Sequence, residues 1–116
     1  MEIFQLAALV AQHDQAGRPY LEFLRHPSLS LGLYRLPAGA TDPQRPHTED
    51  EVYLIVAGKG MIHVDGEDRD IEAGSLVYVP AGARHYFHTI SAELTLVVLF
   101  APAENALAPD RSRRPT

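Results

Sequence analysis

The sequence predicts an all-β fold, a barrel or a sandwich, preceded by one short helix. From Tyr20 onward the chain consists of short runs rich in β-branched, aromatic and leucine residues. Glycine, proline and aspartate separate these runs, which is the pattern of strands joined by tight turns. The length of 116 residues allows one domain with one core and excludes a second folded domain.

The helix is expected at the start of the chain. Leu6, Leu9 and Val10 recur at helical spacing in the stretch LAALVAQHDQAG. Gly17 followed by Pro19 is a signal for the end of a helix. We therefore predict a helical segment within residues 1–19, followed by a β domain over residues 20–101.

Eight runs are candidate strands within the β domain. In chain order they read YLEFLRH, LSLGLYRL, EVYLIVA, GMIHVD, RDIEA, SLVYVP, RHYFHT and LTLVVLF. The stretch from Ala57 to Gly60 is expected to be a turn between two strands, and the pair Asp65-Gly66 suits a tight hairpin. Consecutive strands should thus be mostly antiparallel neighbours.

The composition changes after Phe100. The last stretch, APAENALAPDRSRRPT, contains three prolines and few bulky side chains. Such a segment cannot bury enough apolar surface to offset the entropy of ordering it. Residues 102–116 are therefore predicted to form a flexible C-terminal tail.

Charge and residue usage exclude several classes of protein. The formal net charge of −5 disfavours binding to nucleic acid. The chain has no cysteine, so a metal would have to be bound by histidine and carboxylate side chains. Glu2 stands where a secretory signal would carry a basic residue, and no apolar run approaches the roughly 18 residues of a membrane span. We expect a cytoplasmic protein without a membrane segment.

Two segments carry the candidate chemistry. Residues 39–58 read GATDPQRPHTEDEVYLIVAG, and residues 74–89 read GSLVYVPAGARHYFHT. His47 and Glu51 are four residues apart, which places both side chains on one face of an extended segment. His85 begins a strand in the second segment, and a barrel can bring that strand to the same interior point. Two imidazoles and one carboxylate leave coordination positions open, as catalytic metal sites do.

The first of these segments resembles the first conserved motif of the cupin superfamily. Gly39, His47, Glu51 and Gly58 fall in register with that motif, and Arg45 occupies the place of its first histidine.

The second segment resembles the second cupin motif. Gly74, Pro80, Gly82 and His85 match it, and Thr89 stands where the motif has asparagine. The resemblance implies a small single-domain cupin, a double-stranded β-helix barrel of the jelly-roll type. It also implies one divalent metal ion, Fe, Mn, Ni or Zn, bound by His47, Glu51 and His85.

Other polar residues near the motifs leave alternatives open. Arg45 cannot bind a cation, but it can anchor a carboxylate or phosphate of a substrate, or point outward and pair with nearby acids. Glu49 is the alternative carboxylate ligand to Glu51, and Gln44 is a weaker oxygen donor. The remaining histidines are interpreted as structural or surface residues: His13, His26, His63 and His88.

The function predicted from this site is that of a metal-dependent enzyme, dioxygenase-like or isomerase-like, acting on a small organic molecule. A small-molecule binder or sensor without catalysis is the alternative, because one fold hosts many functions. The sequence identifies no catalytic residue beyond the metal ligands. By resemblance to small cupins, a homodimer is also expected.

Overall fold

A computed structural model describes residues 1–106 of the chain. The elements are α1 (Leu6–Ala16), β1 (Tyr20–His26), β2 (Leu29–Leu36), β3 (Asp50–Val64), β4 (Glu67–Glu72), β5 (Leu76–Val79) and β6 (His85–Ala101). The prediction of an all-β protein with one short N-terminal helix is confirmed. Among the described residues, no helix is long and apolar enough to cross a membrane.

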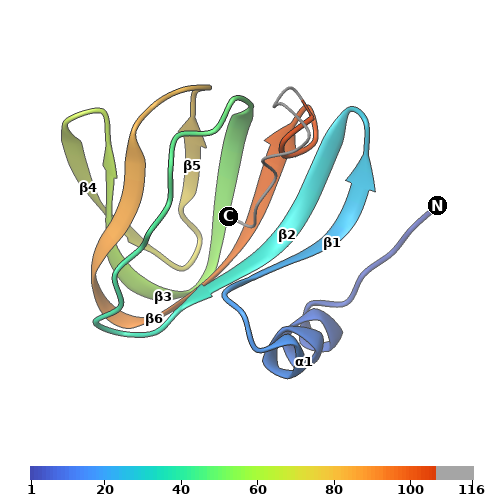
Figure 1. The fold of residues 1–116 in the computed structure, drawn as a ribbon. Coiled ribbons are helices and arrows are strands. Elements are labelled where there is room, and N and C mark those ends of the chain that lie inside the picture. Colours follow the sequence, from blue (N-terminus) through green and yellow to red (C-terminus); the bar gives the residue numbers. More distant parts are fainter. Residues whose placement is uncertain (107–116) are drawn as a thin grey trace.

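The strands form one antiparallel sheet that curls round into a barrel. The hydrogen-bonded order is β1-β2-β6-β3-β4, and β5 pairs with the first part of β3. Figure 1 shows the two long strands, β3 and β6, curving through the molecule, with β4 and β5 on one side and β1 and β2 on the other. Because β3 and β6 each contribute to both sides, the fold is the expected double-stranded β-helix.

Two of the predicted breaks between strands are wrong. The stretch from Ala57 to Gly60 lies inside the continuous strand β3, and the two runs between His85 and Ala101 form the single strand β6. Around this glycine-containing stretch the pairing of β3 with β6 continues, with register shifts between residues 55 and 61. At Gly58 the φ angle is +99°, and an added Cβ would lie 2.1 Å from the carbonyl oxygen of Glu93. Gly58 therefore bends the strand where it crosses β6, instead of reversing the chain.

The barrel interior is mainly apolar. Its buried core includes aliphatic side chains of β2, β3 and β6 and five aromatic side chains from the strands: Tyr20, Tyr34, Tyr53, Phe87 and Phe100. Burial of one such side chain contributes about 1.5–3 kcal/mol. Polar groups that point into this interior are therefore exceptional, and they mark the region of chemical interest.

Helix α1 lies outside the barrel beside β1 and β2 (Figure 1). It ends at Gly17, whose φ of +68° forms a left-handed cap. On the helix, Leu9 and His13 are buried, and His13 Nε2 lies 2.6 Å from the carbonyl oxygen of Pro19. His13 is thus a structural residue that connects the helix to the start of β1.

The C-terminal segment begins with packed residues, which differs from the predicted tail at residues 102–116. Ala103 and Glu104 are both buried. The Ala103 N–H donates to the carbonyl of Pro27 at 3.3 Å, and the Glu104 N–H donates to Ser30 Oγ at 2.9 Å. The hairpin of β1 and β2 thus supplies the hydrogen-bond partners that fix residues 103 and 104: Pro27 lies in its turn and Ser30 at the start of β2. Residues 107–116 of the predicted tail lie outside the described residues.

Candidate metal centre

The three predicted ligands come from one loop and from the starts of two strands. His47 lies in the loop before β3, Glu51 is the second residue of β3, and His85 is the first residue of β6. The turn before β6 is joined to this loop, since the Gly82 N–H donates to the His47 carbonyl at 2.7 Å. The Ala81 N–H donates to Asp50 Oδ1 at 2.9 Å. These bonds bring the two motif segments together.

The side chains of His47, Glu51 and His85 converge inside the barrel. One candidate ligand atom from each lies within 4.8 Å of the other two. Glu51 and His85 are almost fully buried, and the His47 side chain is 11% exposed. The sequence therefore identified three residues that the fold brings to one point.

The inner atoms of this cluster lack hydrogen-bond partners. These atoms are His47 Nε2, both carboxylate oxygens of Glu51, and His85 Nε2. His85 Nδ1 lies 2.8 Å from the carbonyl oxygen of Ala83, and a carbonyl only accepts, so Nδ1 carries the proton. In the neutral ring, Nε2 then presents a lone pair to Glu51 Oε1 at 3.1 Å. A cation between the two groups satisfies both, so the donor set fits a bound metal.

On each of the two imidazoles, burial lowers the pKa and the negative charge of Glu51 raises it. Burial lowers the pKa of His47, and the neighbouring His85 lowers it further, against the attraction of Glu51. Burial also disfavours a charged His85, but the negative charge of the Glu51 carboxylate, whose Oε1 lies 3.1 Å from Nε2, outweighs burial and raises the pKa of His85. The unlike shifts show that the Glu51 carboxylate acts more strongly on His85 than on His47.

A buried carboxylate next to the cluster was missed by the sequence interpretation. Asp42 accepts hydrogen bonds from the Tyr34 hydroxyl at 2.6 Å, from Gln44 Nε2 at 2.7 Å and from the Phe87 N–H at 2.9 Å. Gln44 in turn accepts a bond from the Tyr53 hydroxyl at 3.0 Å. The oxygen of Gln44, considered above as a weak metal ligand, is thus occupied by Tyr53.

Glu49 and Arg45 are the two further polar residues considered near the first motif. Glu49 is buried; one of its oxygens accepts a bond from the Thr48 hydroxyl, and the other has no hydrogen-bond partner. It is not part of the group of convergent ligand atoms found among residues 1–106. Arg45 is exposed, two residues before His47. Its role as an anion anchor stays a prediction.

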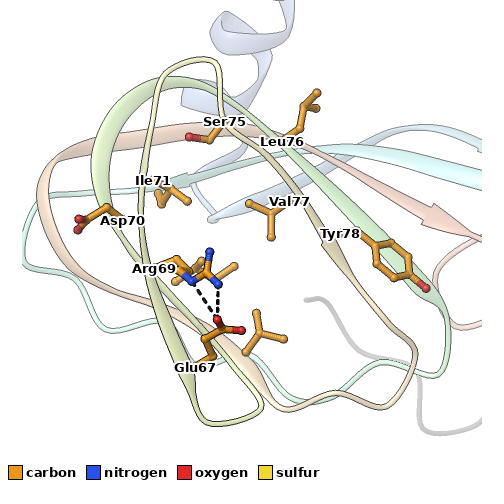
Figure 2. Close-up of a pocket in the computed structure, with 10 residues that line it drawn as sticks. Glu67, Arg69, Asp70, Ile71, Ser75, Leu76, Val77 and Tyr78 are labelled. Atoms are coloured by element: carbon orange, nitrogen blue, oxygen red, sulfur yellow. Dashed lines mark hydrogen bonds and ion pairs between the residues drawn. The ribbon is translucent and has the colours of Figure 1, made fainter.

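A separate pocket opens between β4 and β5. Its volume is about 480 Å³, and Figure 2 shows Ile71 and Val77 beside it together with the ion pair of Glu67 and Arg69. None of the three candidate ligands lines this pocket. It is thus distinct from the convergent cluster.

The fold and the convergent side chains define a barrel protein with a histidine and carboxylate cluster inside. Comparisons with known proteins agree with this fold. The model of the family described as "Cupin domain" matches residues 32–102. The chain belongs to the cupin family, as the motif resemblance implied. An uncharacterized protein of Streptomyces coelicolor is 47% identical over 105 residues, which cover 90% of this chain and 100% of that protein.

Two further proteins share a segment or the fold. Acireductone dioxygenase of Bacillus mycoides is 46% identical over 46 residues, covering 35% of this chain and 27% of that enzyme. The solved structure of an RmlC-like cupin from Methanocaldococcus jannaschii, with a double-stranded β-helix fold, aligns with a TM-score of 0.66 at 21% identity. That alignment covers 72% of this chain and 78% of the other. At this identity the structural likeness supports the fold alone.

Proposed function

We propose that the protein binds one divalent metal ion through His47, Glu51 and His85 and acts on a small organic molecule there. The observation that carries this proposal is the convergence of buried ligand atoms without hydrogen-bond partners. Each unsatisfied buried group costs about 1–3 kcal/mol, and coordination of a cation removes that cost. Two imidazoles and one carboxylate suit Fe, Mn, Ni or Zn.

The reaction class we favour is dioxygenase-like, with an isomerase-like reaction on the same ligands as the alternative form. A bound metal with open positions supplies Lewis acidity toward substrate oxygens or a place for dioxygen. Tyr53 contributes a proton-bearing hydroxyl, because burial and then the nearby Glu51 charge hold its pKa well above the usual value. The similarity of a 46-residue segment to acireductone dioxygenase supports this class.

The test uses protein loaded separately with Fe²⁺, Mn²⁺, Ni²⁺ and Zn²⁺. Dioxygen uptake is measured with small molecules that can chelate a metal through two oxygens, and product analysis follows isomerisation. The His85→Ala variant is the matched control. Turnover that is lost in this variant supports the enzyme. If the metal-loaded parent binds a ligand tightly but shows no turnover, the protein is a small-molecule binder or sensor and not an enzyme.

Arg45 is our candidate anchor for an anionic group of the substrate. Its side chain is exposed, and it belongs to the same loop as His47, two residues before it. Arg45→Gln should weaken the binding of carboxylate ligands and leave metal affinity unchanged, as measured by calorimetry on metal-loaded protein. If parent and variant bind carboxylate ligands with equal affinity, Arg45 does not contribute to substrate binding.

We further propose a homodimer formed through the outer face of β3 and β5. Leu54, Leu76 and Tyr78 are exposed there, and Leu54 and Leu76 are register partners on adjacent strands. A stable interface buries about 1,200–2,000 Å² in total, so neighbouring strands must contribute as well. Light scattering should give a dimer for the parent and a monomer for Leu76→Glu. A monomeric parent at tens of micromolar would contradict the proposal.

A further inference from the structure

The two imidazoles of the candidate metal centre have different outer partners. His85 donates through Nδ1 to the carbonyl of Ala83, whereas His47 Nδ1 faces Glu104 Oε2 at 3.9 Å. On both rings the inner atom is Nε2, and neither Nε2 has a hydrogen-bond partner. Each ring thus presents the same nitrogen to the cluster and turns the other nitrogen toward an acceptor.

The backbone holds Glu104 in this place from both sides. Its N–H donates to Ser30 Oγ at 2.9 Å, and its carbonyl accepts a bond from Arg25 Nη2 at 2.8 Å. The Glu104 side chain is only 8% exposed, so it points into the molecule. Burial raises the pKa of the Tyr20 hydroxyl, and the negative charge of Glu104 raises it further.

We infer that Glu104 is a positioning residue for His47: its carboxylate accepts the Nδ1 proton and thereby directs the Nε2 lone pair toward the metal. This inference rests on the proposed metal function of the cluster. The separation of 3.9 Å exceeds the upper end of N–H···O hydrogen bonds, about 3.2 Å, by roughly 0.7 Å, which side-chain torsions can close. A carboxylate behind a ligating histidine fixes its tautomer and raises its basicity.

Glu104 lies outside the part of the chain that matches the family model. The family match ends at residue 102, and both motif segments lie before it. The metal centre is therefore completed by a residue of the C-terminal segment that packs on the hairpin of β1 and β2. Docking of that segment and ordering of His47 should occur together.

The test compares Glu104→Met, which keeps the bulk but removes the acceptor, with Glu104→Gln, which keeps an acceptor oxygen. Glu104→Ala is a second apolar variant in case the methionine variant does not fold. Glu93→Gln is the control, because Glu93 is an exposed carboxylate that pairs with Arg35. Affinity for Zn²⁺ is measured by competition with a chelator. The tautomers of His47 and His85 are measured in metal-free protein by ¹⁵N NMR at one fixed pH.

The apolar variants should bind Zn²⁺ about 10–100-fold more weakly than the parent, with Glu104→Gln between them and the parent. His47 should lose its preference for the Nδ1–H tautomer, while His85 keeps it. Parent-like affinity and an unchanged His47 tautomer in the apolar variants would overturn the inference. A second result would also overturn it: weaker Zn²⁺ binding, an unchanged His47 tautomer, and an altered coordination number when Co²⁺ is bound instead. Glu104 would then be a direct metal ligand.

Failure of the proposed function gives a different result. A parent that binds no Zn²⁺, Mn²⁺ or Fe²⁺ contradicts the metal centre itself. The tautomer of His47 in metal-free parent and variants still decides whether Glu104 positions that ring.

Discussion

Within residues 1–106, two clusters of two histidines and one carboxylate can be compared, one inside the barrel and one on its surface. The inner cluster is His47, Glu51 and His85; the surface cluster is His63, Asp68 and His88. On the surface, Asp68 Oδ1 lies 3.1 Å from His63 Nδ1 and 2.7 Å from His88 Nε2. The remaining ring nitrogens are also engaged, by the Gly66 N–H at 3.1 Å and by the Thr89 hydroxyl at 2.9 Å.

Residue types therefore do not distinguish the two clusters, but burial and hydrogen bonding do. In the surface cluster, each ring nitrogen has a partner and solvent reaches the side chains. In the inner cluster, four buried atoms face one another without a partner. A buried polar group without a partner is costly, and it persists where a ligand compensates it. The comparison supports the proposal that a metal ion would bind the inner cluster and not the surface cluster.

Removing one histidine from each cluster is the strongest way to break this comparison. His85→Ala should lower metal affinity by more than about 100-fold, beyond the 10–100-fold typical of outer partners, since one of three ligands is lost. His88→Ala should leave the affinity unchanged. Metal content by mass spectrometry decides the result, and circular dichroism confirms that both variants are folded. Equal metal loss in both variants would contradict the distinction between the clusters.

Added metal should also separate the two clusters by thermal stability. An ion present at 100 times its dissociation constant adds about 2.7 kcal/mol if it binds only the folded protein. For a chain of this size the melting temperature should then rise by roughly 10 °C. The rise should persist in the variant His63→Ala and disappear in Glu51→Ala, as measured by differential scanning fluorimetry. A rise that depends on His63 would assign the metal to the surface.

The smallest expected effect is the pH dependence contributed by the surface cluster. Hydrogen bonds from His63 and then from His88 lower the pKa of Asp68 below its usual value of 3.8. Because the folded-state pKa is the lower one, this contribution to stability is complete above 3.8 and is lost as the pH falls through the folded value. Asp68→Asn should therefore melt slightly below the parent at about pH 6 and coincide with it at about pH 2. A difference that grows toward low pH would contradict the sign.

The sequence predicted the fold and the convergent residues because both depend on local spacing. His47 and Glu51 stand four residues apart, and His85 follows the turn at Pro80 and Gly82. The continuity of β3 was missed because a glycine with positive φ, such as Gly58, occurs both in turns and in bent strands. Which of the two forms here depends on the close approach of β6, and that contact is not visible in the sequence.

The supporting carboxylates could not be predicted, for a different reason. Asp42 reaches the core through the path of the loop between β2 and β3, and Glu104 through the packing of the segment after β6. Neither path leaves a periodic pattern in the sequence. Glu104 also lies in a stretch whose composition resembles a tail, so its burial depends on partners such as Ser30 that are distant along the chain.

The ladder between β3 and β6 has a consequence for the kinetics of unfolding. Glu51 pairs with Phe100 near one end of this ladder, and His85 pairs with Val64 at the other end. A flat pair of strands would hold the two residues about 43 Å apart, at 3.3 Å for each of the 13 steps from Glu51 to Val64. Curling of the sheet brings their side chains to 3.1 Å. The first loosening of that curl separates the ligands, so an ion bound between them should slow unfolding while leaving the folding rate nearly unchanged.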